Sequence, residues 1–156
     1  MMFSYRLVRL IETHADVLAA GLENKVLASK QVDHFRNVPG HELRERVYEI
    51  YRHLGDWLLG RNQGDIELRY RQIGARRALQ KVPLPEVIQA IVLTKENLWE
   101  FLKSEAVMDR AVEIMGELEL LQMLEQFFDR AIYFAAVGYQ EEVEHLKRQE
   151  HEVMAR

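Results

Sequence analysis

The side chains best suited to chemistry are scattered along the chain and form no familiar catalytic set. Glu142 and His145 lie three residues apart, which places a carboxylate and an imidazole on one helical face. Ferritin-like di-iron bundles use two such pairs and two further glutamates, and this chain has one pair. Cysteine is absent, which excludes disulfides and thiolate chemistry. Phosphate-binding loops, nucleophile elbows and metalloprotease motifs are also absent. The sequence therefore predicts no enzyme, no catalytic residue and no metal site.

Arg77 is a charged side chain in register with the apolar positions Ile66, Tyr70 and Ile73. A guanidinium at this register can contact an anion or another ligand in an internal pocket. The simpler interpretation is a rim arginine, with its stem packed on apolar neighbours and its charged head in water. Under the first interpretation, Tyr70, Ile73, Arg77 and Trp99 are the candidate lining of a small ligand pocket.

Long helices are expected to position these residues. Apolar residues recur at spacings of three and four, and no segment alternates as a strand does. We expect breaks at Asn37–Gly40 and at Gly60–Asp65, an N-cap at Asp65, and Pro85 in the first turn of a helix. The predicted fold class is all-α: one bundle of about five to seven helices with a long C-terminal helix. The expected helices are Ser4–Lys30, Leu43–Leu58, Ile66–Gln80, Pro85–Leu102 and Asp109 to the C-terminus.

Composition narrows the class of protein further. The 156 residues carry a net charge of −4, with acidic and basic residues interspersed, so nucleic-acid binding is not expected. No apolar run reaches the roughly 18 residues needed to span a bilayer. The first residues lack the apolar core of a signal peptide. We therefore expect a cytoplasmic protein without a membrane partner.

The last helix is expected to carry more apolar surface than one chain covers. It is apolar on most sides between Leu118 and Val137. Beyond Gly138 a thin apolar stripe continues among charged residues, as in a coiled coil. We therefore predict a homodimer, with a helical sensor domain at 1–138 and a signalling helix or coiled-coil connector at 139–156. A solvated C-terminal helix in a monomer is the alternative. The candidate interface residues are Leu121, Phe128, Ile132, Ala135 and Tyr139.

The run from Ile73 to Leu84 (Ile-Gly-Ala-Arg-Arg-Ala-Leu-Gln-Lys-Val-Pro-Leu) carries a family resemblance. It resembles the N-terminal sensor domain of the RsbR/RsbRD stressosome co-antagonists, and the likeness extends over about Ile11 to Leu146. The resemblance implies a bacterial stress-response sensor with a non-haem, globin-like fold. It also implies a downstream STAS-type or kinase output. Four further segments share it: Leu43–Val47, Gly55–Leu58, Glu86–Ala90 and Tyr139–Glu142.

The same run is similar to the proximal region of globin-coupled oxygen sensors, where Ile-Gly and two further residues precede the haem-binding histidine. Arg77 occupies the histidine position here, and no histidine lies between His53 and His145. A guanidinium stays protonated and offers no lone pair to iron. The sequence therefore predicts no haem and no other cofactor.

Together these observations predict a non-enzymatic signal-input domain. It dimerises, and it relays a change induced by an unknown small ligand or by a partner through its C-terminal helices. A free-standing protein-interaction adaptor is the first alternative. A haem-binding globin-type sensor is the second.

Overall fold

The computed structural model describes residues 5–58, 63–105 and 111–155 of the chain. Within these ranges the chain forms helices joined by short turns, without strands, so the all-α fold with a long C-terminal helix is confirmed. None of the helices described here is long and apolar enough to cross a membrane. The elements are α1 (Tyr5–Thr13), α2 (Ala15–Ala28), the 3-10 helix η1 (Lys30–Asn37), α3 (Gly40–Arg52), α4 (Leu54–Leu58), α5 (Gln63–Leu79), α6 (Leu84–Glu105) and α7 (Ala111–Ala155).

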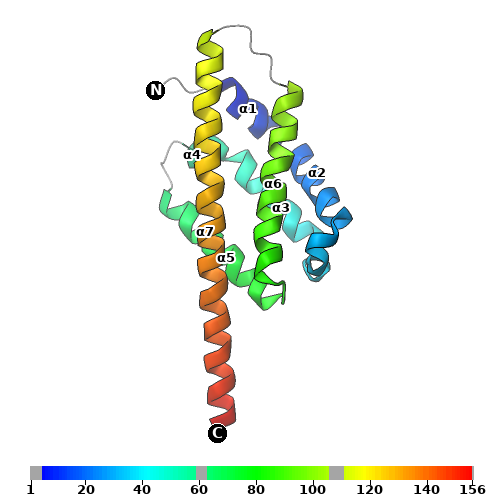
Figure 1. The fold of residues 1–156 in the computed structure, drawn as a ribbon, viewed down its shortest axis with the longest axis vertical. Coiled ribbons are helices and arrows are strands. Elements are labelled where there is room, and N and C mark those ends of the chain that lie inside the picture. Colours follow the sequence, from blue (N-terminus) through cyan, green and yellow to red (C-terminus); the bar gives the residue numbers. More distant parts are fainter. Residues whose placement is uncertain (1–4, 59–62, 106–110, 156) are drawn as a thin grey trace.

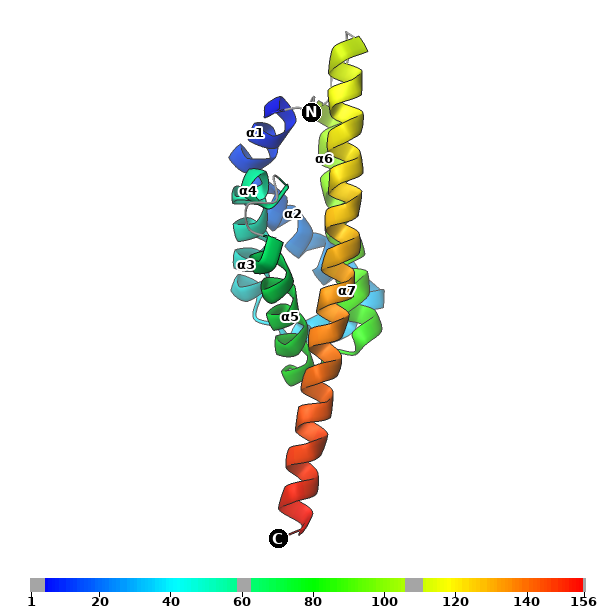
Figure 2. The same ribbon diagram turned by 90° about the vertical axis from the view of Figure 1, so that its left-hand side faces the viewer.

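The two longest helices, α6 and α7, run antiparallel and form the axis of the molecule (Figure 1). The 45 residues of α7 correspond to about 67 Å at ~1.5 Å per residue. Helix α5 lies along α7 (Figure 2), and these two helices share the most extensive contact in the fold. Helix α2 packs against α3 and α6.

Two expected helices are divided by short breaks. The backbone leaves helical geometry at His14, where the imidazole Nδ1 hydrogen-bonds the Leu10 carbonyl oxygen at 2.9 Å. A second break at His53 separates α3 from α4. The predicted N-cap at Asp65 is wrong, because α5 begins two residues earlier at Gln63. Residues 59–62 and 106–110, which include parts of the expected breaks and the expected start at Asp109, lie outside the described residues.

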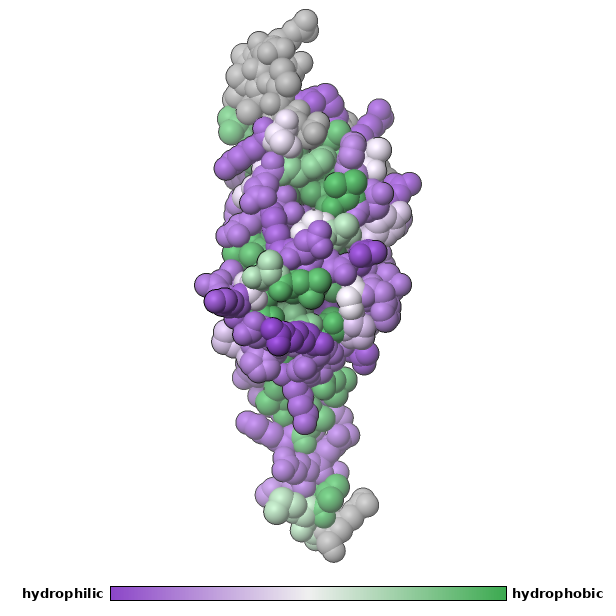
Figure 3. Space-filling view, turned by 90° about the vertical axis from the view of Figure 1, so that its right-hand side faces the viewer, coloured by the Kyte–Doolittle hydropathy of each residue, from purple (hydrophilic) through white to green (hydrophobic). Residues whose placement is uncertain are grey.

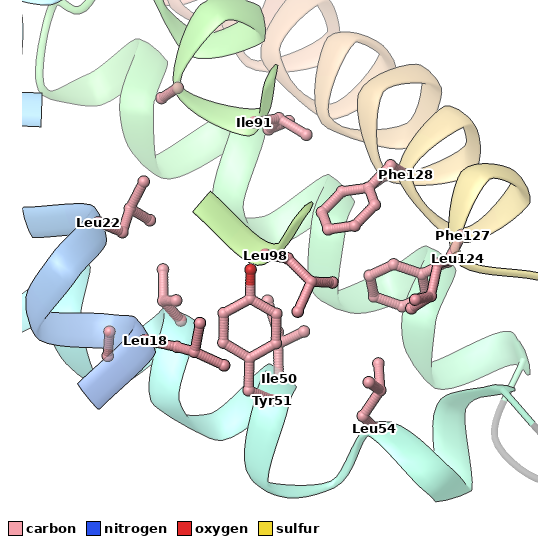
Figure 4. Packing of buried hydrophobic residues seen from close by; sticks show 14 of the residues in the cluster. Leu18, Leu22, Ile50, Tyr51, Leu54, Ile91, Leu98, Leu124, Phe127 and Phe128 are labelled. Carbon is pink, nitrogen blue, oxygen red and sulfur yellow. The ribbon is translucent and has the colours of Figure 1, made fainter. Parts of the chain in front are cut away.

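The core lies between α2, α3, α6 and α7. The Leu98 side chain of α6 is fully buried between the Tyr51 ring of α3 and the two phenylalanines of α7 (Figure 4). The Tyr51 hydroxyl donates to the carbonyl oxygen of Thr94 at 3.0 Å, so this buried polar group is satisfied. The two α7 rings, Phe127 and Phe128, pack edge to face with centroids 5.4 Å apart.

Helix α5 ends in a Schellman motif that turns the chain into α6. The Val82 N–H donates to the Arg77 carbonyl at 3.1 Å, and the Lys81 N–H donates to the Ala78 carbonyl at 3.1 Å. Lys81 has a φ of 60°, the left-handed conformation that this motif requires. Pro85 is the second residue of α6, so the prediction that it lies in a first helical turn is confirmed.

Candidate functional site

A cavity of about 60 Å³ lies where η1, α3, α5, α6 and α7 meet. Three of the predicted pocket residues, Tyr70, Ile73 and Arg77, line it together, because they are one helical turn apart on α5. The fourth, Trp99, does not line this cavity and is half-buried on α6, where it packs against the core. The remaining walls are mostly aliphatic and aromatic, and they include Phe35 of η1 and Phe128 of α7.

Arg77 is buried, with 3% of its surface exposed, so its interpretation as a rim arginine is wrong. Its Nη1 donates to Glu42 Oε1 at 3.0 Å and to Gln80 Oε1 at 2.8 Å. The guanidinium also lies over the Phe35 ring, with its central carbon 5.9 Å from the ring centroid. The helical pattern places Arg77 correctly on the inner face of α5. The pattern does not reveal that α3 supplies a carboxylate, that of Glu42, to the buried guanidinium.

Glu42, near the start of α3, is the acceptor that makes this burial tolerable. Besides Arg77 it accepts from Arg76 Nε at 3.2 Å and from Gln80 Nε2 at 3.1 Å. Burial alone would raise the pKa of Glu42, but the hydrogen bonds and charges of Arg76 and Arg77 outweigh it and lower the pKa below its ordinary value. One carboxylate therefore serves two guanidinium groups.

A second arginine, the half-buried Arg46, also lines the cavity. Burial lowers the pKa of Arg77, the bonds to Glu42 oppose this shift, and the positive charge of Arg46 adds to it. Arg46 makes no ion pair or hydrogen bond with any residue that the structure describes. The cavity is therefore bordered by more positive than negative charge.

Two hydroxyl groups complete the polar part of the lining. Burial raises the pKa of the Tyr70 phenol well above its ordinary range, so the hydroxyl stays protonated. The Tyr70 ring packs edge to face against Phe127, with centroids 5.9 Å apart. The Thr94 hydroxyl donates to the Ala90 carbonyl at 2.8 Å and retains lone pairs for a further donor. Tyr70 offers a donor and Thr94 an acceptor to a cavity occupant.

Directly beside the cavity, α5 and α7 touch backbone to backbone at two glycines. A Cβ atom on Gly74 would lie 1.9 Å from the Ala135 carbonyl oxygen, and one on Gly138 would lie 2.0 Å from the Arg71 carbonyl oxygen. Glycine is required at both positions because any side chain would force the helices apart. Arg71 also binds Glu141 at 2.8 Å across the junction.

The predicted interface residues occupy different environments in α7. Phe128 and Ala135 are buried inside the chain, which leaves them little surface to offer to a second copy. Leu121 and Ile132 are half-buried beside the same core. Tyr139 is held within the chain, because its hydroxyl donates to the Val82 carbonyl at 2.6 Å. The most exposed aromatic side chain of α7 is Tyr133, which the sequence analysis did not select.

Past the body of the domain, α7 continues as a stalk, residues 140–155, whose first turn is still bonded to α5 through Glu141 and Arg71 (Figure 1). Apolar residues alternate with charged residues along the stalk. Further apolar residues are exposed on the face of the body shown in Figure 3. Leu146, Val153 and Met154 are exposed to 37%, 71% and 79%. His145 on the stalk contacts Gln149, four residues on, and no cluster of three metal-ligating side chains occurs in the described part of the chain.

The sequence analysis missed Glu42, Arg46 and Gly138 as parts of this site. Arg46 had a usable signal, because it lies three residues after Leu43 and four before Ile50, in register with an apolar stripe, as Arg77 does. In the sequence, Gly138 only marks the point where the composition of the last helix changes from apolar to charged. Glu42 carries no local signal, since its partners come from a different helix.

Comparison with known proteins identifies a family for this chain. The family described as the RsbT co-antagonist protein rsbRD N-terminal domain matches residues 9–154. No curated protein and no solved structure matches the chain significantly. The match begins within α1 and ends one residue before the end of α7. The residues of the cavity and the glycine junction, and nearly the whole stalk, therefore lie within the matched range. The chain therefore belongs to this family of stressosome-related regulatory domains.

Proposed function

We propose that this chain is a non-enzymatic signal-input domain that works in the cytoplasm as a homodimer. Occupation of the cavity by a small ligand changes the position of α5 against α7, and the stalk carries the change to an output of the STAS or kinase type. Residues 1–138 are the sensor part and residues 139–156 the connector. The regulatory character of the family supports the proposal.

The observation that carries the proposal is the glycine junction between α5 and α7. Ile73 and Arg77 line the cavity, and Gly74, between them on the same helix, touches the α7 backbone at Ala135. Backbone contact leaves no soft side chain to absorb a displacement, so movement of α5 is passed to α7. The stalk is the continuation of α7 and moves with it.

A homodimer is supported by the stalk. Its apolar positions Val143, Leu146 and Val153 follow the spacing of a coiled-coil seam, and each is partly or largely exposed in one chain. A single chain leaves this stripe in water, whereas two parallel stalks cover it. The seam is short, so the two body domains must contribute further contact, and the exposed Tyr133 and Leu118 of α7 are the candidates.

Spin labels on the stalk test the relay. The chain has no cysteine, so Arg148→Cys, at an exposed position of the stalk off the seam of Val143, Leu146 and Val153, gives one labelling site per chain. We expect a defined distance between the two labels of a dimer. Ala90→Val, which adds two methyl groups to the cavity wall, is expected to shift that distance. Ala28→Val, on the exposed end of α2, is the matched control and leaves it unchanged.

Two results would refute the proposal. Absence of any label–label interaction at high protein concentration means that the stalks do not pair. An unchanged distance in a folded Ala90→Val protein means that the cavity does not communicate with the stalk. Circular dichroism of the variants confirms that they are folded before the distances are compared.

A further inference from the structure

We propose that the cavity binds a small organic anion, a carboxylate with a short hydrocarbon chain. The carboxylate lies between Arg46 and Arg77, and the chain fills the apolar part of the cavity. The inference rests on the proposed function in treating this cavity as the sensory site, and it names the chemical class of the ligand.

The charges around the cavity are unbalanced in favour of an anion. No aspartate or glutamate lines the cavity, whereas two arginines, Arg46 and Arg77, do. Glu42, the carboxylate bound to Arg77, is already shared between Arg76 and Arg77. Arg76 and Arg77 share this one carboxylate and Arg46 has no ion pair among the described residues, so a second negative charge would be stabilised beside Arg46 and Arg77.

The hydrogen-bonding groups needed for an anion are also unused. Both described bonds of Arg77 come from Nη1, and neither Nε nor Nη2 bonds a side chain in the described part of the chain. Arg46 has no described partner at all. Guanidinium groups bind carboxylates through two parallel N–H bonds, and both arginines retain the donors for this.

The size and polarity of the cavity indicate what kind of group is attached to the carboxylate. A volume of about 60 Å³ holds a few heavy atoms, since a single water occupies roughly 10–15 Å³ of such space. Most of the wall is aliphatic or aromatic, so a sulfate or phosphate ion would leave its inner side without partners. A short hydrocarbon chain complements that wall. Acetate, propionate and butyrate are the smallest members of this class.

Isothermal titration with defined probes tests the ligand class. Sodium butyrate is compared with butyramide, which has nearly the same shape without the charge, and with sodium sulfate, which has the charge without the chain. Sodium chloride keeps the ionic strength constant. We expect one butyrate per chain, bound at least about tenfold more tightly than either comparison compound.

Substitutions on α3 and α6 locate the site. Arg46→Gln removes one guanidinium without leaving a described carboxylate unpaired, and it is expected to weaken butyrate at least about tenfold. Arg52→Gln makes the same change of charge on the same helix at an exposed position away from the cavity, and it leaves the affinity unchanged. Ala90→Val fills the cavity and abolishes binding.

The proposal is overturned if butyramide or sulfate binds as tightly as butyrate, if no butyrate binds, or if Arg46→Gln binds it normally. Failure of the sensor function is a separate result. If butyrate binds as expected but the stalk labels at position 148 do not respond to it or to Ala90→Val, the ligand class stands and the relay fails. If the labels respond to Ala90→Val while no carboxylate binds, the relay stands and the ligand class is wrong.

Discussion

At the scale of single residues, Glu42 is the group on which the buried arginine depends. Arg77 is 3% exposed, and an arginine buried this deeply is costly unless its charge is paired. Glu42 supplies the charge, while Gln80 accepts from Arg77 and donates to Glu42. These three side chains join α3 to the end of α5, next to the cavity.

Glu42→Gln is expected to lower the free energy of unfolding by about 2–3 kcal/mol near neutral pH, because it leaves Arg77 buried without a negative partner. Arg76→Gln is the control, since its side chain is 53% exposed, and it is expected to cost about 1 kcal/mol or less. Urea unfolding of the three proteins gives the comparison. If both substitutions lowered the free energy of unfolding equally, the Glu42–Arg77 pair would contribute no more to stability than the exposed Glu42–Arg76 pair.

The difference in stability between the natural chain and Glu42→Gln is expected to depend on pH, and the pKa of Glu42 gives the direction. The pKa of Glu42 is lowered in the folded protein below its ordinary value of 4.5. Its contribution is therefore fully present above that value and is lost as the pH falls through the lowered pKa. The stability gap between the natural chain and Glu42→Gln is expected to narrow at acid pH. A gap that widens on acidification would contradict this account.

At the scale of elements, the contact between α5 and α7 depends on residues without side chains. Gly74 and Gly138 each meet a backbone carbonyl of the other helix, as the Cβ distances show. Ile73 of α5 and Phe128 of α7 line the same cavity, so this close approach holds the two helices together beside it. The Arg71–Glu141 ion pair and the Tyr139–Val82 hydrogen bond bracket the junction.

Gly74→Ala is expected to destabilise the fold by about 3 kcal/mol or more, because the new methyl group would collide with a backbone oxygen that cannot rotate away. Gly55→Ala is the matched control on α4. Its nearest neighbour, Val8 Cγ1, is 3.5 Å from the new Cβ, an ordinary contact, so alanine should be neutral or stabilise by up to about 1 kcal/mol. Thermal or urea unfolding distinguishes the two. A neutral Gly74→Ala would mean that α5 and α7 are not held this closely.

At the scale of the whole molecule, a compact body carries a long, protruding stalk (Figure 2). The stalk's exposed apolar stripe contributes nothing to the stability of a single chain, and the proposed pairing with a second copy would remove it from water. Parallel pairing would also bring both C-termini to one end of the dimer, where an output partner can respond to both.

Leu146→Glu is expected to weaken dimerisation at least about tenfold, because it places a charge in each half of the stalk seam. Leu27→Glu is the control, since Leu27 is 69% exposed on α2, far from the stalk. Light scattering after size-exclusion chromatography should give a mass near twice 18.4 kDa for the natural chain and for the control. A mass of one chain at high concentration for the natural protein would contradict the dimer.

Much of the fold was predictable from local patterns. The helical segments, the breaks near Pro39 and Pro83 and the long last helix follow from the spacing of apolar residues and from proline and glycine, which act on the backbone where they stand. The breaks at His14 and His53 were missed, because they follow from packing α1 and α4 over the same core and not from a local breaker.

The sequence by itself determined an all-helical chain, an apolar inner face on α5 that includes Tyr70, Ile73 and Arg77, and a coiled-coil-like stripe at the C-terminus. Only the tertiary structure decided that Arg77 is buried against Glu42, that Trp99 lies away from the cavity, and that Phe128 and Ala135 turn inward. The physical reason is that periodicity tells which side of a helix avoids water, while the identity of the neighbour that covers it depends on contacts between residues far apart in the chain.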